Sequence, residues 1–152
     1  MNLLSIIVPI YKSEFNIPTA IERIEELKER IYNKGFELEA IFVDDGSPDN
    51  SFEILKKYKE EKQWIKIVKF TRNFGVPYGA LAGLEHAEGD CVTVLVPDMQ
   101  DPPELLDEML DEWKNGCKII IAERKNREES LMQKITSSMF HKLMKNFALP
   151  NY

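Results

Sequence analysis

Two short acidic segments of this 152-residue chain have side chains suited to hold a divalent cation. One is V-L-V-P-D-M-Q-D-P-P-E at 94–104, where Asp98, Gln100 and Asp101 follow an apolar run. Carboxylate and amide oxygens suit Mg²⁺ or Mn²⁺, and Mg²⁺ commonly takes one or two carboxylates plus ligand phosphates. The segment therefore predicts a site where a cation meets a phosphate. For Asp101 the alternative is to cap the helix predicted to start near Pro103.

The other acidic segment, D-D-G-S at 44–47, places Asp44 and Asp45 directly after a second apolar run. Adjacent carboxylates repel each other, so they need a cation, hydrogen-bond donors or water. We expect the pair to bind a ligand, with a carboxylate accepting hydrogen bonds from a ribose or a base amide. The alternative is a plain turn in which Asp49 or Asn50 caps the next helix.

Three arginines, Arg72, Arg124 and Arg127, lie in further polar segments and could meet a diphosphate. Arginine suits this role because its guanidinium fork makes bidentate hydrogen bonds with phosphate oxygens. The alternative is ion pairing at the surface with the glutamates at 123, 128 and 129.

Alternating apolar runs and amphipathic segments predict the elements that position these side chains. Strands are predicted at 3–8, 38–43, 64–70, 91–96 and 118–122, and helices at 17–32, 50–61, 78–87, 103–114 and 130–147. Pro9 is expected to end the first strand, and the run at 91–96 is expected to be buried.

This alternation is typical of an α/β fold with a mostly parallel, Rossmann-like sheet flanked by helices. Ligands bind such sheets at the carboxyl ends of the strands. The polar segments all follow predicted strands, and they lie at 11–14, 44–47, 72–75, 98–101 and 123–127. We therefore expect these loops to converge on one edge of the sheet.

Composition narrows the class of protein. A net charge of -6 argues against a general nucleic-acid binder, and no stretch is apolar for the roughly 18 residues that a membrane span needs. Cys91 and Cys117 lie in strand-like runs and are interpreted as buried, reduced thiols, which favours a cytoplasmic protein. No Ser-His-Asp set, zinc spacing, G-x-G-x-x-G or P-loop is visible. We expect a single domain, 1–152, truncated at its C-terminus.

The last segment, 130–152, contains no acidic residue and carries Lys134, Lys142 and Lys145. A basic amphipathic helix of this kind can lie at an anionic membrane surface. The alternative is a helix packed on the sheet with its lysines in water.

Together these segments resemble the family 2 glycosyltransferases, above all polyprenyl-phosphate sugar transferases and related bacterial cell-envelope enzymes. The matching segments are S-I-I-V-P-I-Y-K-S-E at 5–14, V-D-D-G-S-P-D-N-S at 43–51, R-N-F-G at 72–75, D-M-Q-D-P-P-E at 98–104 and, more loosely, A-E-R-K-N-R at 122–127. The resemblance implies a GT-A fold, a nucleoside-diphosphate sugar donor, Mg²⁺ or Mn²⁺, and inversion at the anomeric carbon. It also implies a place at the cytoplasmic face of a membrane.

The resemblance assigns roles to individual residues. Pro9, Tyr11 and Glu14 would border the base, Asp44 and Asp45 would hold the base or ribose, Asp98 and Gln100 would lie at the metal and diphosphate, and Arg124 would lie near the phosphates or the acceptor. A lipid-phosphate acceptor is already anionic and needs no strong base. A saccharide acceptor needs a carboxylate base, for which Asp101 is the candidate.

The sequence departs from the family at two positions. Val96 stands where the family commonly has the first Asp of Asp-x-Asp-x-Gln-Asp, and Val76 stands where many relatives carry a lysine. The first change favours a second hypothesis, a nucleotide-binding module without turnover. A third, a sugar nucleotidyltransferase, is disfavoured because P-I-Y-K-S-E replaces the Gly-rich loop usual after the first strand of such enzymes.

Overall fold

A computed structural model describes residues 1–98 and 104–122 of the chain. Its compact unit Met1–Ile120 contains nearly all of them, and the second unit, Ile121–Tyr152, is described only at its first two residues. The described elements are β1 (Asn2–Ile10), α1 (Ile17–Tyr32), β2 (Phe36–Asp44), α2 (Ser51–Glu61), β3 (Ile65–Lys69), α3 (Val76–Glu85), β4 (Cys91–Val94) and α4 (Leu105–Lys114).

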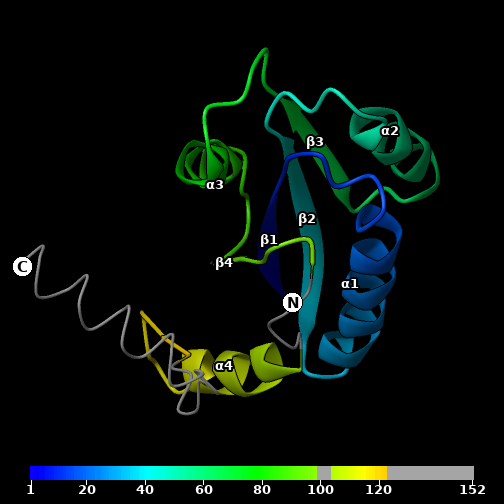
Figure 1. Cartoon of the computed structure of the whole chain (residues 1–152). Coiled ribbons are helices and arrows are strands. Elements are labelled where there is room, and N and C mark those ends of the chain that lie inside the picture. Colours follow the sequence, from blue (N-terminus) through cyan, green and yellow to red (C-terminus); the bar gives the residue numbers. More distant parts are fainter. Residues whose placement is uncertain (99–103, 123–152) are drawn as a thin grey trace, which may run out of the picture. The chain divides into compact units, whose positions relative to one another are not determined.

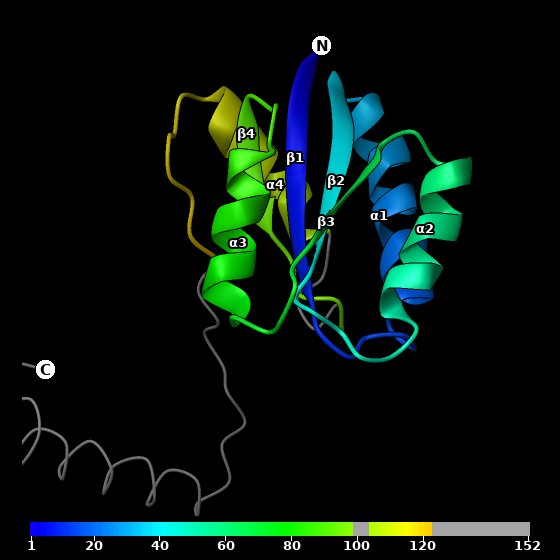
Figure 2. The same cartoon turned by 90° about the horizontal axis from the view of Figure 1, so that it is seen from above.

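The described strands form one sheet in the order β3-β2-β1-β4, and every pair is parallel. Helices α1 and α2 lie on one side of the sheet and α3 lies on the other (Figures 1 and 2). Parallel neighbours need a crossover, and each crossover here is a helix. The expected α/β fold with a mostly parallel sheet is confirmed.

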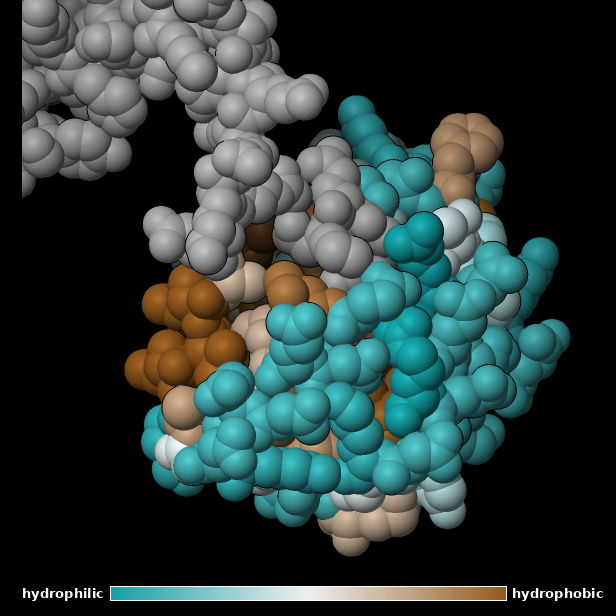
Figure 3. Space-filling model, turned by 90° about the horizontal axis from the view of Figure 1, so that it is seen from below, coloured by the Kyte–Doolittle hydropathy of each residue, from teal (hydrophilic) through white to brown (hydrophobic). Residues whose placement is uncertain are grey.

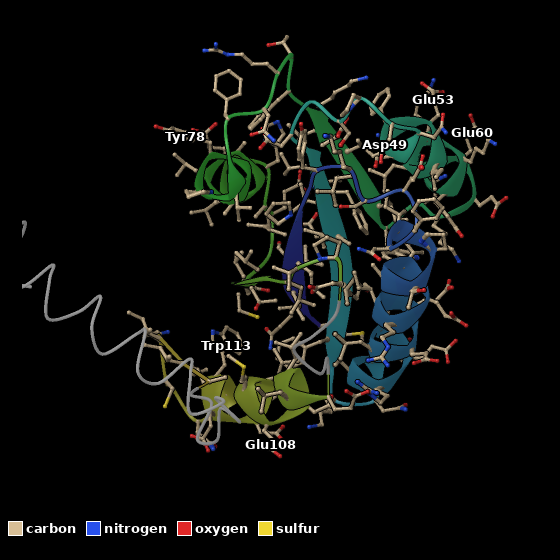
Figure 4. The ribbon with its side chains drawn as sticks, in the orientation of Figure 1. Asp49, Glu53, Glu60, Tyr78, Glu108 and Trp113 are labelled. Carbon is tan, nitrogen blue, oxygen red and sulfur yellow. The ribbon has the colours of Figure 1, made fainter. Side chains whose placement is uncertain are left out.

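The main core lies on the side of α1, α2 and α4. It combines alternate residues of β1 (Leu4, Ile6 and Val8) with the apolar stripe of α1, whose predicted bounds are confirmed. Helix α4 buries Leu106 and Leu110. The ring centroids of its Trp113 and of Phe36 lie 5.7 Å apart (Figure 4). The inward face of this helix is therefore the predicted one.

Helix α3 approaches the sheet through glycines. A Cβ on Gly83 would lie 2.3 Å from Ile7 Cγ2, so only glycine lets the helix come this close there, and one on Gly79 would make a tight contact of 3.1 Å with Pro9 Cβ. Larger apolar residues of α3, including Leu81 and Leu84, are exposed and line an open groove with β4. Seen from below, the surface is mostly hydrophilic, with hydrophobic residues gathered at one side (Figure 3).

The predicted end of the first strand is wrong, because Pro9 lies inside β1 in register with Val43. Leu95 N–H donates to Ile7 O at 2.9 Å, so the backbone polar groups of Ile7 point toward β4. The backbone of Pro9, two residues further on, has the same orientation but lies beyond the end of β4. Its missing N–H therefore leaves no ladder bond unmade.

Two further strand predictions need correction. The fourth strand is shorter than 91–96 and is an edge of the described sheet, with Val92, Val94 and Val96 exposed rather than buried. Residues 118–122 form no strand. An apolar run does not show which neighbours pair with it, and pairing decides both outcomes.

The prediction that both cysteines are buried is wrong for Cys117, which is exposed. Cys91 is partly buried, and burial raises the pKa of its thiol to about 11. Both are free thiols. The helix predicted at 130–147 lies outside the described residues.

Candidate functional site

The loops that follow β1 and β2 and the chain that leaves β3 gather at one end of the sheet (Figure 2). This follows from topology, because parallel strands deliver their carboxyl ends to the same edge. Predicted site residues from three separate segments, among them Tyr11, Asp44 and Arg72, thus share this edge.

The loop after β1 is fastened to the loop after β2 by short hydroxyl side chains. Lys12 N–H donates to Ser47 Oγ at 3.1 Å, and Ser13 N–H donates to Ser51 Oγ at 3.0 Å. Lys12 adopts a left-handed φ of 52°, which a lysine rarely does. Its ammonium lies 5.3 Å from the ring centroid of the half-exposed Tyr11.

Glu14 is part of the same fastening. Its Oε2 accepts from Asn50 N–H at 3.0 Å and from Asn50 Nδ2 at 3.2 Å, while Asp49 Oδ2 accepts from Glu14 N–H at 3.4 Å. Asp49 also accepts from Ser51 N–H at the start of α2 (Figure 4). Burial acts to raise the pKa of Asp49, but its hydrogen bonds from Ser51 and Glu14 outweigh it and lower that pKa.

The adjacent aspartates differ in their hydrogen bonds. Asp45 accepts from the backbone N–H groups of Phe74 and Gly75, each at 2.7 Å. Asp44 is fully buried, and its Oδ1 accepts from Ser47 N–H at 3.1 Å. Its Oδ2 is also buried and has no hydrogen-bond partner within the described residues. The donors that we expected the pair to need are thus present for Asp45 and missing at one oxygen of Asp44.

Arg72 is exposed and is positioned by an aromatic ring. Its Cζ lies 4.7 Å from the centroid of Phe74. The Phe74 ring also lies 5.5 Å from Phe70 and 6.4 Å from Tyr78 on α3 (Figure 4). The guanidinium therefore stands at the same edge as the aspartate pair.

The remaining predicted residues divide into described and undescribed positions. Pro9 is buried under α3, where a Cβ on Gly79 would touch it. Asp98 is exposed in a turn that follows β4. Gln100, Asp101 and Arg124 lie outside the described residues.

The side chains present could hold a cation only together with a bound substrate. The described residues contain no group of three or more His, Cys, Asp or Glu side chains that could hold a metal ion. Mg²⁺ usually binds through one or two carboxylates with phosphates and waters, so Asp98 after β4 fits a cation that a substrate diphosphate helps to hold.

The sequence interpretation missed the fastening roles of Ser47, Ser51 and Asp49, and the backbone partners of Asp45. A signal for the first group was present. Closely spaced Ser, Asp and Asn residues before a helix are typical of side-chain to backbone bonds. No comparable signal exists for Asp45, whose partners lie about thirty positions further along the chain.

The fold and site define a class, the α/β domains that bind their ligands at the carboxyl ends of parallel strands. More narrowly, the chain belongs to glycosyl transferase family 2, whose model matches residues 5–151. The resemblance to family 2 glycosyltransferases that the loop segments indicated is thereby confirmed.

Two relatives illustrate the match. The chain is 38% identical over 141 residues to the uncharacterized glycosyltransferase YkcC of Bacillus subtilis, covering 92% of this chain and 43% of the relative. It is 31% identical over 148 residues to the bactoprenol glucosyl transferase of Shigella phage SfV, covering 97% of this chain and 47% of the relative. The chain thus spans less than half the length of these relatives.

Among solved structures, TarS 1–349 of S. aureus in complex with UDP resembles this chain with a TM-score of 0.58 at 25% identity. The likeness covers 83% of this chain and 40% of TarS 1–349. The expected GT-A fold is confirmed. Within the part of the chain that the structure describes, every helix is too short or too polar to traverse a bilayer.

Proposed function

We propose that this chain binds the donor of a glycosyltransferase that moves a sugar from a nucleoside-diphosphate sugar to a lipid-phosphate acceptor. The observation that carries the proposal is the buried Oδ2 of Asp44 at the carboxyl end of β2, which has no hydrogen-bond partner among the residues that the structure describes in this family 2 chain. Membership of the family supports sugar transfer, and the site supports the donor.

An unpartnered buried carboxylate oxygen is costly, by roughly 1–3 kcal/mol or more. An N–H of a base or a hydroxyl of a ribose would supply the missing donor. The loops beside Asp44 are already fastened to one another through Ser47 and Ser51, so the nucleotide would enter an ordered edge. Binding that satisfies Asp44 is therefore favourable, because the new hydrogen bond removes this penalty.

The acceptor assignment has a separate support. One relative is named a bactoprenol glucosyl transferase, which favours a lipid acceptor over a saccharide. A lipid phosphate is anionic near neutral pH, so transfer to it needs no strong general base. Transfer to a sugar hydroxyl would need one, with Asp101 as the candidate. A lipid acceptor also supports a place at the cytoplasmic face of a membrane and a role in the cell envelope, with the basic segment 130–152 as the candidate membrane contact.

A divalent cation, Mg²⁺ or Mn²⁺, would be held by Asp98 and Gln100. When bound it supplies charge stabilisation to the departing diphosphate. Arg72 would contribute a second positive charge from the opposite side of the edge, with Arg124 as a further candidate. Attack by the acceptor from the face opposite the leaving group gives inversion.

The test is calorimetric titration with UDP-, GDP- and dTDP-sugars in the presence of Mg²⁺ or Mn²⁺. We expect one donor series to bind, and Asp44→Asn to weaken that binding about tenfold, the worth of one charge-assisted hydrogen bond. Asp90→Asn is the matched control, because Asp90 accepts a hydrogen bond from Leu3 N–H near the amino end of β4. Binding of none of the three nucleotides would sink the proposal, and unchanged affinity in Asp44→Asn would remove its main support.

Val96 favours a second candidate, a nucleotide-binding module without turnover. Its side chain is 39% exposed after β4, where the family commonly has a metal-binding Asp. This candidate makes the same binding predictions and differs in one result. The full-length protein would bind the donor but transfer no sugar to a polyprenyl phosphate.

A further inference from the structure

We propose that Asp45 is a positioning residue, which fixes the loop 72–75 so that Arg72 meets the donor diphosphate. This rests on the function proposed above, because it concerns how the donor site is built. It separates the two adjacent aspartates into one that awaits a ligand and one that orders the site.

The first step is the hydrogen bonding of Asp45. Its two oxygens accept from two successive backbone N–H groups, Phe74 and Gly75, each at 2.7 Å. Hydrogen bonds to a carboxylate are short and roughly twice as strong as neutral ones. The carboxylate of Asp45 is thereby held against the loop 72–75, whereas Oδ2 of Asp44 has no hydrogen-bond partner within the described residues.

The second step leads from Phe74 to Arg72. The backbone of Phe74 is held by Asp45, and its ring carries the guanidinium of Arg72 at 4.7 Å. The ring is itself fixed by edge contact with Phe70 at 5.5 Å. A cation over an aromatic face is worth roughly 0.5–1 kcal/mol at an exposed site. The direction of Arg72 therefore depends on where Asp45 holds Phe74.

The third step is an independent contact at the next residue. Gly46 has φ +66°, and a Cβ there would lie 2.5 Å from Arg72 C and 2.9 Å from Asn73 N. The backbones of the two loops are thus in direct contact at Arg72, while Asp45 holds Phe74 and Gly75. Both halves of the loop 72–75 are set by residues 45 and 46, which lie immediately after β2.

The decisive experiment is a double-mutant cycle on donor affinity in the full chain. The variants are Asp45→Asn, Arg72→Ala and the double variant, titrated with the donor that wild type binds. Asparagine keeps one acceptor oxygen and loses the other, so Asp45→Asn should weaken binding about tenfold. In the Arg72→Ala background it should weaken binding less than twofold, because residues that act through one another are non-additive.

A second readout needs no nucleotide. The ¹⁵N–¹H resonances of Phe74 and Gly75 should move in Asp45→Asn and stay in place in Asp44→Asn. Asp90→Asn removes a comparable bond, from Leu3 N–H at 2.8 Å, and should change neither these resonances nor the donor affinity. Should Asp45→Asn fail to fold, Phe74→Leu keeps the backbone clamp and removes only the ring, and it should weaken donor binding by a few-fold, less than Arg72→Ala does.

Additive losses from Asp45→Asn and Arg72→Ala, with unmoved Phe74 and Gly75 resonances, would overturn the proposal and make Asp45 a direct ligand. Unchanged donor affinity in Phe74→Leu would overturn the step from Phe74 to Arg72. A wild type that binds no nucleotide sugar would refute the proposed function instead, and the resonances would still decide whether Asp45 fixes the loop.

Discussion

The loops after β1, β2 and β3 are held differently from the segment after β4. The first three are fastened to one another, through Ser47 and Ser51 on one side and Asp45 on the other. The ladder of β4 with β1 ends at Val94, followed by the bond from Leu95 N–H to Ile7 O at 2.9 Å. Asp98 lies beyond that point.

The opposite end of β4 is held by several hydrogen bonds. Leu3 and Asp90 exchange hydrogen bonds, each at 2.8 Å, and Gly89 N–H donates to Ser5 Oγ at 2.9 Å. Glu88 N–H donates to the buried Glu39 at 2.7 Å. The comparison teaches that the proposed donor site and the proposed metal residue Asp98 follow different strands of one edge, so variants should affect them separately.

The largest effect should come from Asp98→Ala. It should lower sugar transfer by about a hundredfold or more, the usual loss when a group that stabilises developing charge is removed. It should also abolish the Mn²⁺-dependent part of donor binding while leaving the metal-independent part. Calorimetry with and without Mn²⁺ separates the two. Glu108→Ala, an exposed acidic position on α4, is the control (Figure 4).

If Asp98→Ala removed metal-independent binding as well, the two parts of the edge would not be separate. Unchanged binding and transfer would show that the segment after β4 is not the metal site.

Gly46→Ala should have the next largest effect and should lower the free energy of unfolding by about 3 kcal/mol. It combines a left-handed φ with a Cβ placed 2.5 Å from Arg72 C. Gly35→Ala is matched, because Gly35 has φ +82° with nothing within 4 Å and isolates the backbone cost, about 1 kcal/mol. Urea denaturation measures both. Equal losses would mean that the two loops can move apart freely.

Glu39→Gln should cost about 2 kcal/mol near neutral pH and change the acid response. Burial acts to raise the pKa of Glu39, but hydrogen bonds from Lys66, Ser5 and Glu88 N–H outweigh it, so the folded pKa lies below 4.5. Its stabilisation is therefore present above pH 4.5 and is lost as pH falls through the lowered pKa. Denaturation midpoints between pH 7 and pH 3 should fall less steeply in the variant.

The control for Glu39→Gln is Glu53→Gln, an exposed partner of Lys56 on α2. If Glu39→Gln lost stability with falling pH as steeply as wild type, Glu39 would not be the group that anchors the start of β4.

The smallest effect should come from Val96→Asp. The position is 39% exposed, so a carboxylate is tolerated there, and it restores the first Asp of the family segment. We expect a few-fold lower Mn²⁺ concentration at half-maximal donor binding, since a second carboxylate adds a hard ligand. A metal titration at fixed donor checks this. Weaker metal dependence would place the cation elsewhere.

Sequence patterns predicted best where local spacing decides the outcome. The bounds of α1 follow from apolar residues at helical spacing, with Pro18 at its start and Gly35 after its end. They predicted β4 and residues 118–122 worst, because an apolar run carries no information on which strands flank it. The position of Pro9 likewise depends on where β4 ends.

The site shows the same division. That Asp44, Arg72 and Asp98 follow strands is readable from the sequence, and parallel topology brings them to one edge. The different partners of Asp44 and Asp45 are not readable, because they depend on where the N–H groups of Phe74 and Gly75 come to lie.

The fastening by Ser47, Ser51 and Asp49 has a thermodynamic consequence. These side chains have few rotamers, so fixing them loses less conformational entropy than fixing lysine, arginine or glutamine would. The backbone entropy of these loops is lost when the chain folds and is not lost again when a ligand arrives. The heat capacity change on nucleotide binding should therefore reflect the ligand and protein surface that is buried on contact, without a contribution from the ordering of these loops.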